Sequence, residues 1–198
     1  MNLPNKLTVA RIIATPIFLA VMLAQGIPYR FTIALVLFVL ASLTDLLDGK
    51  IARGRGLVTN FGKFLDPIAD KMLTTAALLG FMVVLDNKSF IVQITVMTFL
   101  TLFREFAVAS VRLIAVSSAS KKVIPANIWG KLKTVFQMAS IISGLLAYSV
   151  KEFISLSDTV WDIMMCIFII ISWIAAITGV VSGVIYLIES KEYLDSSK

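Results

Sequence analysis

The sequence contains no histidine and only one cysteine, Cys166. Without histidine, the chain has no imidazole to serve as a general base or as a metal ligand. A single cysteine cannot form a disulfide within the chain, and it cannot build a cysteine-based zinc site. The chemistry of any polar site must therefore come from carboxylates, amines, guanidinium groups, hydroxyls and amides.

Charged residues are scarce at 15% of the 198 residues, whereas hydrophobic residues make up 59%. This balance lies well outside that of soluble domains and is typical of integral membrane proteins. A helix needs about 20 mostly apolar residues to cross the hydrocarbon core. The apolar tracts predict an all-α fold of six transmembrane helices, and residues 1–198 are expected to form a single membrane domain. The six expected helices cover residues 7–24, 31–50, 63–85, 90–117, 128–149 and 158–188.

The positions of lysine and arginine predict the orientation in the membrane, because short cytoplasmic connections collect these residues. The connections after the second and fourth expected helices are the richest, and the other three carry about one each. With six helices, both termini are then expected on the cytoplasmic side of the cell membrane. The net charge of +6 favours contact with anionic membrane phospholipids, and nothing suggests nucleic acid. The residues of the two rich connections are Lys50, Arg53, Arg55, Lys63, Lys121 and Lys122.

Four aspartates lie close together in the stretch DLLDGKIARGRGLVTNFGKFLDPIAD, residues 45–70, with apolar tracts on both sides. Asp45 and Asp48 are one helical turn apart, and so are Asp66 and Asp70. Four ionised carboxylates at membrane depth would repel one another, and each is unfavourable in a low dielectric unless it is compensated. Divalent cations are the natural compensation. Oxygen-only ligation favours Mg²⁺ or Mn²⁺ over Zn²⁺, and four shared carboxylates suit two ions.

Small residues accompany these acids on the same helical face. Gly49 lies beside Asp45 at the next turn, and Ala52 lies beside Asp48. Taken alone, the small residues are typical of helix packing in membranes, but beside the acids they favour the close approach of a polar ligand. Two bridged divalent ions are a recurring arrangement for displacement at phosphorus. Thr59 or Asn60 is expected to cap the following helix.

These residues together resemble the signature of the CDP-alcohol phosphotransferase family. The resemblance extends over nearly the whole chain, because the segments NLPNKLTVAR, FREFAVASVR and GKLKT are similar to those of bacterial members that use glycerol 3-phosphate as the alcohol. The eight fixed positions of the signature, matched at the same spacing without a departure, are Asp45, Asp48, Gly49, Ala52, Arg53, Gly62, Asp66 and Asp70.

The resemblance implies an enzyme that transfers the phosphatidyl group of CDP-diacylglycerol to glycerol 3-phosphate and releases CMP. It also implies a homodimer and a polar cavity that faces the cytoplasm. Asp70 would be the base for the acceptor hydroxyl. Two divalent cations, Mg²⁺ or Mn²⁺, would be held by Asp45, Asp48, Asp66 and Asp70. The CDP pocket would be bordered by Gly49, Ala52, Arg53, Thr8 and Thr59.

The motif identifies only the donor, so the alcohol acceptor must be inferred from residues outside the motif. Glycerol 3-phosphate is a dianion, and arginine suits bidentate binding of phosphate. Arg104 and Arg112 are eight residues apart, roughly on one helical face, with Glu105 as an expected partner. Cations buried in a membrane helix usually face a cavity or an anion, although snorkelling to the interface is the simpler explanation for Lys131 and Arg11. The predicted phosphate site consists of Arg104, Arg112, Lys131, Lys133 and Arg11.

A glycine pair in the last apolar tract, Gly179 and Gly183, has the GxxxG spacing, with Ser182 between them. This pattern indicates close helix packing, either within the bundle or between subunits.

Two alternatives to this function remain open. Within the enzyme class, the alcohol could be phosphatidylglycerol, as in a cardiolipin synthase, or inositol phosphate or serine. An acceptor without a phosphate monoester would leave the cationic residues unexplained. A small cation or proton transporter with intramembrane carboxylates is the alternative from another class. A carrier has no need of small residues beside the acids.

Overall fold

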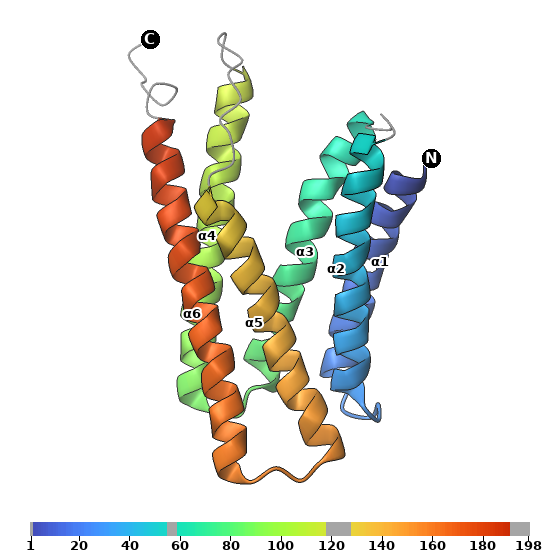
Figure 1. Cartoon of the computed structure of the whole chain (residues 1–198), viewed down its shortest axis with the longest axis vertical. Helices are drawn as coiled ribbons and strands as arrows, with labels where there is room; N and C mark the ends of the chain where they lie inside the picture. The colour runs from blue at the N-terminus through green and yellow to red at the C-terminus, as the bar shows by residue number, and fades with distance from the viewer. Residues whose placement is uncertain (1, 55–58, 118–127, 191–198) are drawn as a thin grey trace. The chain divides into compact units, whose positions relative to one another are not determined.

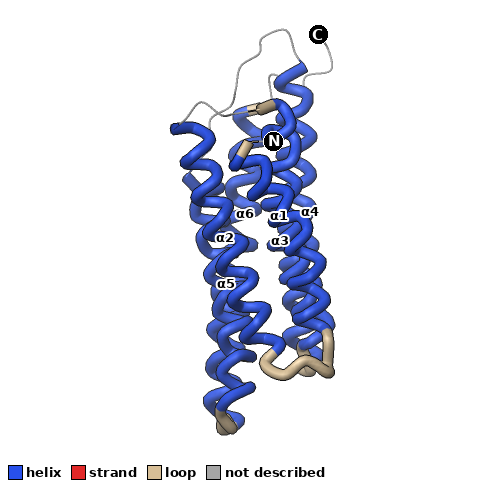
Figure 2. The backbone as a smooth tube through the Cα atoms, turned by 90° about the vertical axis from the view of Figure 1, so that its right-hand side faces the viewer, coloured by secondary structure: helices blue, strands red, loops and turns tan. Residues whose placement is uncertain are grey.

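A computed structural model of the chain describes residues 2–54, 59–117 and 128–190 (Figure 1). Within the helices, the side chains of residues 3, 4, 46–54, 60, 63, 66, 112 and 114–117 are not described. The described residues are helical apart from short connections, and they contain no strand (Figure 2). The helices are α1 (Leu3–Leu23), α2 (Arg30–Gly54), α3 (Asn60–Val84), α4 (Lys88–Ser117), α5 (Ile128–Phe153) and α6 (Asp158–Glu189).

The helices confirm the all-α prediction, and each expected range corresponds to one of them. Over the described residues, four stretches are long and apolar enough to cross a membrane, so the chain is a multi-pass membrane protein. That α2 and α5 also cross the membrane stays a prediction. The four stretches are Asn5–Leu23, Pro67–Val84, Lys88–Val111 and Asp158–Glu189.

The chain divides into two compact units. Unit 1 consists of Met1–Asn87 and Ile141–Phe168, which contain α1 to α3, the end of α5 and the start of α6. Unit 2 consists of Lys88–Ser140 and Ile169–Lys198, which contain α4 and the remaining parts of α5 and α6. That the whole chain acts as a single domain stays a prediction.

In unit 1, α1 lies against both α2 and α3, and α2 and α3 run antiparallel (Figure 1). The core is rich in aromatic rings, with Phe81 and Phe168 packed at a centroid distance of 4.6 Å. Gly144 permits this packing, because a Cβ atom there would lie 2.6 Å from Cζ of Phe81. The α2 helix is capped from α5: Glu152 accepts hydrogen bonds from the backbone N–H groups of Phe31 at 2.9 Å and Thr32 at 3.0 Å.

In unit 2, polar side chains pair across helices inside apolar surroundings. Trp173 in α6 donates a hydrogen bond to Gln93 in α4 at 3.0 Å, and the hydroxyls of Ser140 and Ser172 share another. Such pairs satisfy polar groups that have no water available in the bilayer.

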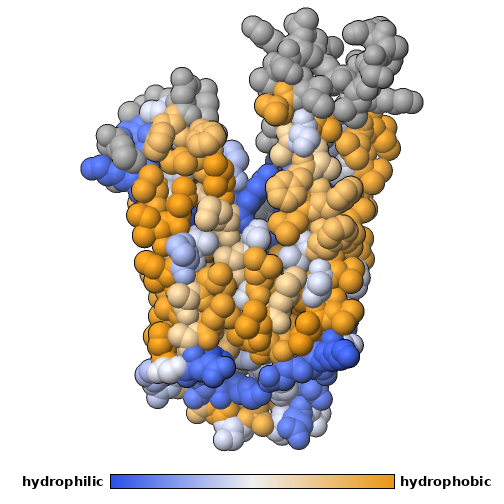
Figure 3. All heavy atoms as spheres, turned by 180° about the vertical axis from the view of Figure 1, so that it is seen from behind, coloured by the Kyte–Doolittle hydropathy of each residue, from blue (hydrophilic) through white to orange (hydrophobic). Residues whose placement is uncertain are grey.

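Many large apolar side chains are exposed along the helices, among them Val83, Phe103 and Ile188. Figure 3 shows apolar residues, in orange, covering the sides of the helices in that view, with hydrophilic residues, in blue, mainly near the helix ends. This distribution is that of a protein surrounded by lipid, since a water-soluble surface would not carry so large an apolar area.

Candidate functional site

The acidic motif lies in unit 1, where α2 ends and α3 begins (Figure 1). Positions 45 and 48 are one helical turn apart in α2, as are positions 66 and 70 in α3, which confirms the helical spacing on which the prediction rests. The side chain of Asp45 is partly exposed, and that of Asp70 is exposed. The side chains of Asp48 and Asp66 lie outside the described part of the structure.

Arg11 in α1 forms an ion pair with Asp45 in α2. Arg11 is only 2% exposed, and its own carbonyl accepts a hydrogen bond from the hydroxyl of Thr15 at 2.9 Å. The sequence predicted Arg11 at the acceptor phosphate, whereas the structure places its guanidinium group at the first acid of the motif. A cation therefore already compensates one of the four carboxylates.

The start of α1 is joined to the start of α3 through Asn5 and Thr59. Thr59 accepts a hydrogen bond from the N–H of Gly62 at 3.0 Å, which confirms it as the N-cap of α3. The amide of Asn5 donates to the same hydroxyl at 2.9 Å. The motif glycine permits this approach, because a Cβ atom at Gly62 would lie 2.9 Å from Oδ1 of Asn5. Asn5 lies in the segment NLPNKLTVAR, which resembles the family, but it is not one of the eight positions of the motif.

The predicted CDP-binding residues are only partly described. Gly49, Ala52 and Arg53 lie in α2, and their side chains are outside the described part of the structure. Thr8 is buried in unit 1, and the hydroxyl of Thr59 takes part in the cap and the contact with Asn5. A role of these residues toward CDP stays a prediction.

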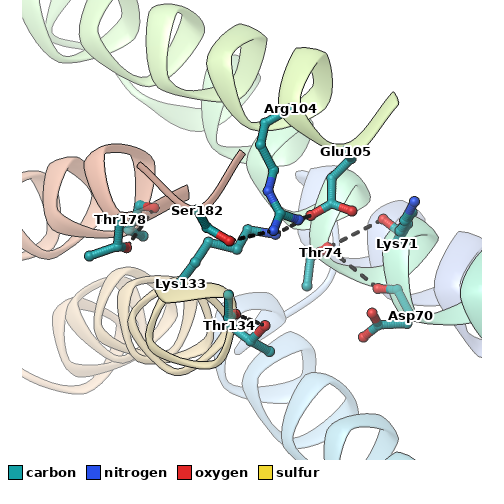
Figure 4. Close-up of polar contacts among 11 residues, drawn as sticks. Asp70, Lys71, Thr74, Arg104, Glu105, Lys133, Thr134, Thr178 and Ser182 are labelled. Carbon is teal, nitrogen blue, oxygen red and sulfur yellow. Dashed lines mark hydrogen bonds and ion pairs between the residues drawn. The ribbon is translucent and has the colours of Figure 1, made fainter. Parts of the chain in front are cut away.

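Unit 2 contains a largely buried ionic cluster, which we call the cationic cluster: Arg104 and Glu105 of α4, Lys133 of α5 and Ser182 of α6 (Figure 4). Nη1 of Arg104 donates to Oε1 of Glu105 at 3.0 Å, and Nζ of Lys133 donates to the same oxygen at 2.6 Å. Nη2 of Arg104 donates to the hydroxyl of Ser182 at 2.9 Å. The exposed fractions of the Arg104, Glu105 and Lys133 side chains are 15%, 16% and 9%, so the charges are largely shielded from water.

The structure brings two of the predicted acceptor residues together at one carboxylate. Arg104 and Lys133 share a carboxylate, and the predicted pairing of Arg104 with Glu105 is confirmed. Lys131 is exposed, and it forms no ion pair within the described part of the chain. It lies two positions before Lys133 in α5, and residues two positions apart in a helix point in different directions. The side chain of Arg112 lies outside the described residues.

The electrostatics of the cationic cluster favour an anion. Two cations share one carboxylate, which leaves a net positive charge on side chains that are largely shielded from water. In addition, Nε of Arg104 is buried and has no hydrogen-bond partner among the described residues. A buried donor without an acceptor is unfavourable, so an anion with several oxygens would satisfy both the charge and the donor.

A multi-pass, all-helical membrane protein with this acidic motif fits a family of lipid-synthesising transferases. The chain belongs to the CDP-alcohol phosphatidyltransferase family, whose profile matches residues 1–185. This finding confirms the family resemblance of the sequence.

Among its relatives, the chain is 38% identical over 207 aligned positions to the CDP-diacylglycerol–glycerol-3-phosphate 3-phosphatidyltransferase of Bacillus subtilis (strain 168), covering 99% of this chain and 98% of that protein. It is 37% identical over 193 positions to the protein of the same name from Rickettsia bellii (strain RML369-C), covering 97% of each. It is 34% identical over 151 positions to a cardiolipin synthase (CMP-forming) of Oryza sativa subsp. japonica, covering 71% of this chain and 44% of the rice protein. No solved structure gives a significant match.

Members of this family use divalent cations, and the donor set of this chain fits them. The motif offers carboxylate oxygens only, and the chain has no histidine to add a softer ligand. The pairing of Arg11 with Asp45 shows that the structure places a positive charge at the motif. The described side chains include only two of the four aspartates, and they form no group of three or more metal ligands.

Proposed function

We propose that the chain transfers the phosphatidyl group of CDP-diacylglycerol to glycerol 3-phosphate, giving phosphatidylglycerophosphate and CMP in phospholipid biosynthesis. The observation that carries this proposal is the similarity, over 99% of the chain, to a Bacillus subtilis protein that bears the name of this activity. The motif with all eight positions intact and the cationic cluster support it from the residues themselves.

On the donor side, the four aspartates would hold two divalent cations, Mg²⁺ or Mn²⁺. Such ions neutralise the oxygens of a diphosphate and stabilise the leaving group. The small residues of the motif would let the CDP group approach the α2 backbone closely. The residues assigned to the metals are Asp45, Asp48, Asp66 and Asp70, and those assigned to CDP are Gly49, Ala52, Arg53, Thr8 and Thr59.

The reaction is a displacement at the phosphorus atom of the phosphatidyl group. The oxygen of the primary hydroxyl of glycerol 3-phosphate forms a bond to this phosphorus. The bond from the phosphorus to the bridging oxygen breaks, and its electron pair leaves with CMP. Asp70 takes the proton of the hydroxyl, a role for which its exposed carboxylate is accessible.

On the acceptor side, we assign the phosphate of glycerol 3-phosphate to Arg104 and Lys133, whose charges exceed that of Glu105. Arg112 lies eight positions after Arg104 in the same helix and is included in the site on the sequence pattern alone. Lys131 and Arg11 remain weaker members of the assignment, because one is exposed and the other pairs with Asp45.

The finer points of membrane placement are part of the same proposal. All six helices would cross the membrane, with both termini and a polar cavity on the cytoplasmic side, where the soluble acceptor is available. A reporter that is active only in the cytoplasm should then be active when it is fused to either terminus.

The protein would form a homodimer, although the structure assigns the GxxxG glycines to contacts within the chain.

Membership of the family sets aside the transporter alternative, and the remaining question is the alcohol. A cardiolipin synthase would use phosphatidylglycerol, but the rice relative with that name is matched over only 44% of its length. Phosphatidylglycerol and serine carry no phosphate monoester, so neither would use the excess charge of the cationic cluster fully.

The test is CMP release by the purified protein with CDP-diacylglycerol, Mg²⁺ or Mn²⁺, and one alcohol at a time. The alcohols are glycerol 3-phosphate, phosphatidylglycerol, inositol 1-phosphate and serine. We expect the fastest release with glycerol 3-phosphate. Faster release with one of the other alcohols would show that the proposed acceptor is wrong.

A further inference from the structure

The glycine pair of α6 contacts the two cations of the cationic cluster. A Cβ atom at Gly183 would lie 2.9 Å from Cγ of Arg104, and one at Gly179 would lie 3.2 Å from Cγ of Lys133. Carbon atoms in good contact are about 3.5–4.0 Å apart, so a methyl group at either position would press on the cation's aliphatic stem. Each glycine therefore leaves space for one cationic side chain.

Ser182 lies on the same face of α6 as the two glycines, because positions 179, 182 and 183 follow the i, i+3, i+4 pattern. Its side chain is buried, and its hydroxyl accepts the hydrogen bond from Nη2 of Arg104 at 2.9 Å (Figure 4). One face of α6 thus contacts the stems of both cations and the head group of one.

These contacts differ from ordinary glycine-mediated helix packing. Among the described residues, a Cβ atom at Gly179 would have only Lys133 within 4 Å. The three nearest atoms to a Cβ atom at Gly183 would all belong to Arg104. At Gly144 in unit 1, by contrast, the neighbours of such an atom are the apolar rings of Phe81 and Phe168. The α6 glycines therefore leave space for charged side chains, whereas Gly144 leaves space for apolar rings.

We propose that Gly179, Ser182 and Gly183 form a cradle that positions Arg104 and Lys133 for the phosphate of the acceptor. The three are positioning residues, because they act through the two cations. This inference rests on the proposed function of the cationic cluster.

The physical basis is preorganisation. Arginine and lysine have long side chains, and ordering them on binding costs rotamer entropy. The cradle fixes the stems from the α6 side, and Glu105 holds both head groups at one oxygen. The cations are then ordered before the phosphate arrives, which removes part of the entropy cost from binding.

The experiment compares Gly183→Ala in the natural chain with Gly183→Ala in an Arg104→Ala background, by kinetics and by thermal unfolding. In the natural chain, we expect a rise of about tenfold in the KM for glycerol 3-phosphate and less than about twofold in that for CDP-diacylglycerol, because the methyl group displaces an acceptor-binding cation. In the Arg104→Ala background, Gly183→Ala should not raise the KM further and should not lower the unfolding temperature, since the contacting stem is gone and alanine favours a helix over glycine.

Two further variants separate positioning from general packing. Ser182→Ala removes the hydrogen bond to Arg104 without adding volume, and it should raise the KM for glycerol 3-phosphate by roughly five- to tenfold. Gly144→Ala is the matched control, because its methyl group would lie 2.6 Å from Cζ of Phe81 in unit 1. It should lower the unfolding temperature and leave the KM for glycerol 3-phosphate unchanged.

The outcomes distinguish the cradle from the acceptor site itself. If Arg104→Ala raises the KM for glycerol 3-phosphate while Gly183→Ala and Ser182→Ala do not, the cradle is wrong and the acceptor site stands. If Gly183→Ala lowers the unfolding temperature equally with and without Arg104, the stem contact is not its target and the cradle is overturned. If Arg104→Ala leaves that KM unchanged, the acceptor site is wrong, and the cradle's functional role falls with it.

Discussion

Lys133 donates a hydrogen bond to Oε1 of Glu105 at 2.6 Å, and Arg104 donates to the same oxygen at 3.0 Å. One carboxylate thus holds the head groups of two cations that come from different helices. A phosphate monoester carries up to two negative charges and three acceptor oxygens, so it can engage both cations more completely than Glu105 alone. This relationship is the structural reason for placing the acceptor phosphate at the cationic cluster.

Replacing Arg104 or Lys133 with alanine should weaken acceptor binding selectively. We expect the KM for glycerol 3-phosphate to rise by at least about tenfold, the scale of a lost hydrogen bond between charged groups, with a much smaller change for CDP-diacylglycerol. Lys88→Ala, at an exposed position at the start of α4, is the control for loss of a lysine charge. Equal changes for both substrates would count against the assignment.

Replacing Arg11 with glutamine should destabilise the metal-free protein. The change removes the cation that pairs with Asp45, an acid one helical turn before Asp48 in α2, and leaves this carboxylate without that partner. The lost interaction is worth about 1.5–3 kcal/mol. Thermal unfolding with and without Mn²⁺ measures the effect, and Lys6→Gln, at an exposed position in the same helix, is the control.

Added Mn²⁺ should raise the unfolding temperature of Arg11→Gln more than that of the natural chain, because the metal supplies the missing positive charge. An equal rise in both proteins would show that Arg11 does not compensate the metal-binding acids.

Chelation should abolish the activity reversibly. The aspartates alone cannot stabilise the negative charge of the donor diphosphate, so CMP release should stop in excess EDTA and return when Mg²⁺ or Mn²⁺ is restored. Zn²⁺ should restore less activity, because the carboxylate ligands favour harder ions. Undiminished CMP release in excess EDTA would contradict the metal assignment.

Substitution by asparagine distinguishes the role of Asp70 as base from the metal-binding role of the other aspartates. Asp70→Asn should keep binding of CDP-diacylglycerol in the presence of metal and lose turnover by at least about a hundredfold, the usual scale for a general base. Asp45→Asn should instead weaken metal and donor binding together. Near-normal turnover by Asp70→Asn would mean that another group takes the proton.

The helices and the acidic motif could be predicted from the sequence because their signals are local. Apolar tracts of sufficient length define the six helices, and Thr59 marks the start of α3. The pairing of Arg104 with Glu105 was also predictable, since the two residues are neighbours in the chain.

The partners from other helices could not be predicted, because they depend on how each helix is rotated. Lys131 and Lys133 have the same residue type and nearly the same position, yet only Lys133 meets Glu105. The contact of Arg104 with Ser182 joins residues 78 positions apart. Arg11 likewise meets Asp45 only because α1 packs against α2.

The most direct test of the central claim is the transfer of ³²P from labelled glycerol 3-phosphate into lipid by the purified protein. With CDP-diacylglycerol and Mg²⁺, we predict labelled phosphatidylglycerophosphate in the organic phase, formed in equal amount to CMP and at least about a hundredfold more slowly with Asp70→Asn. The label should be released by a phosphatase, because the acceptor's phosphate stays a monoester in the product. CMP release without label in the lipid would contradict the account, because it would mean that another alcohol, or water, is the acceptor.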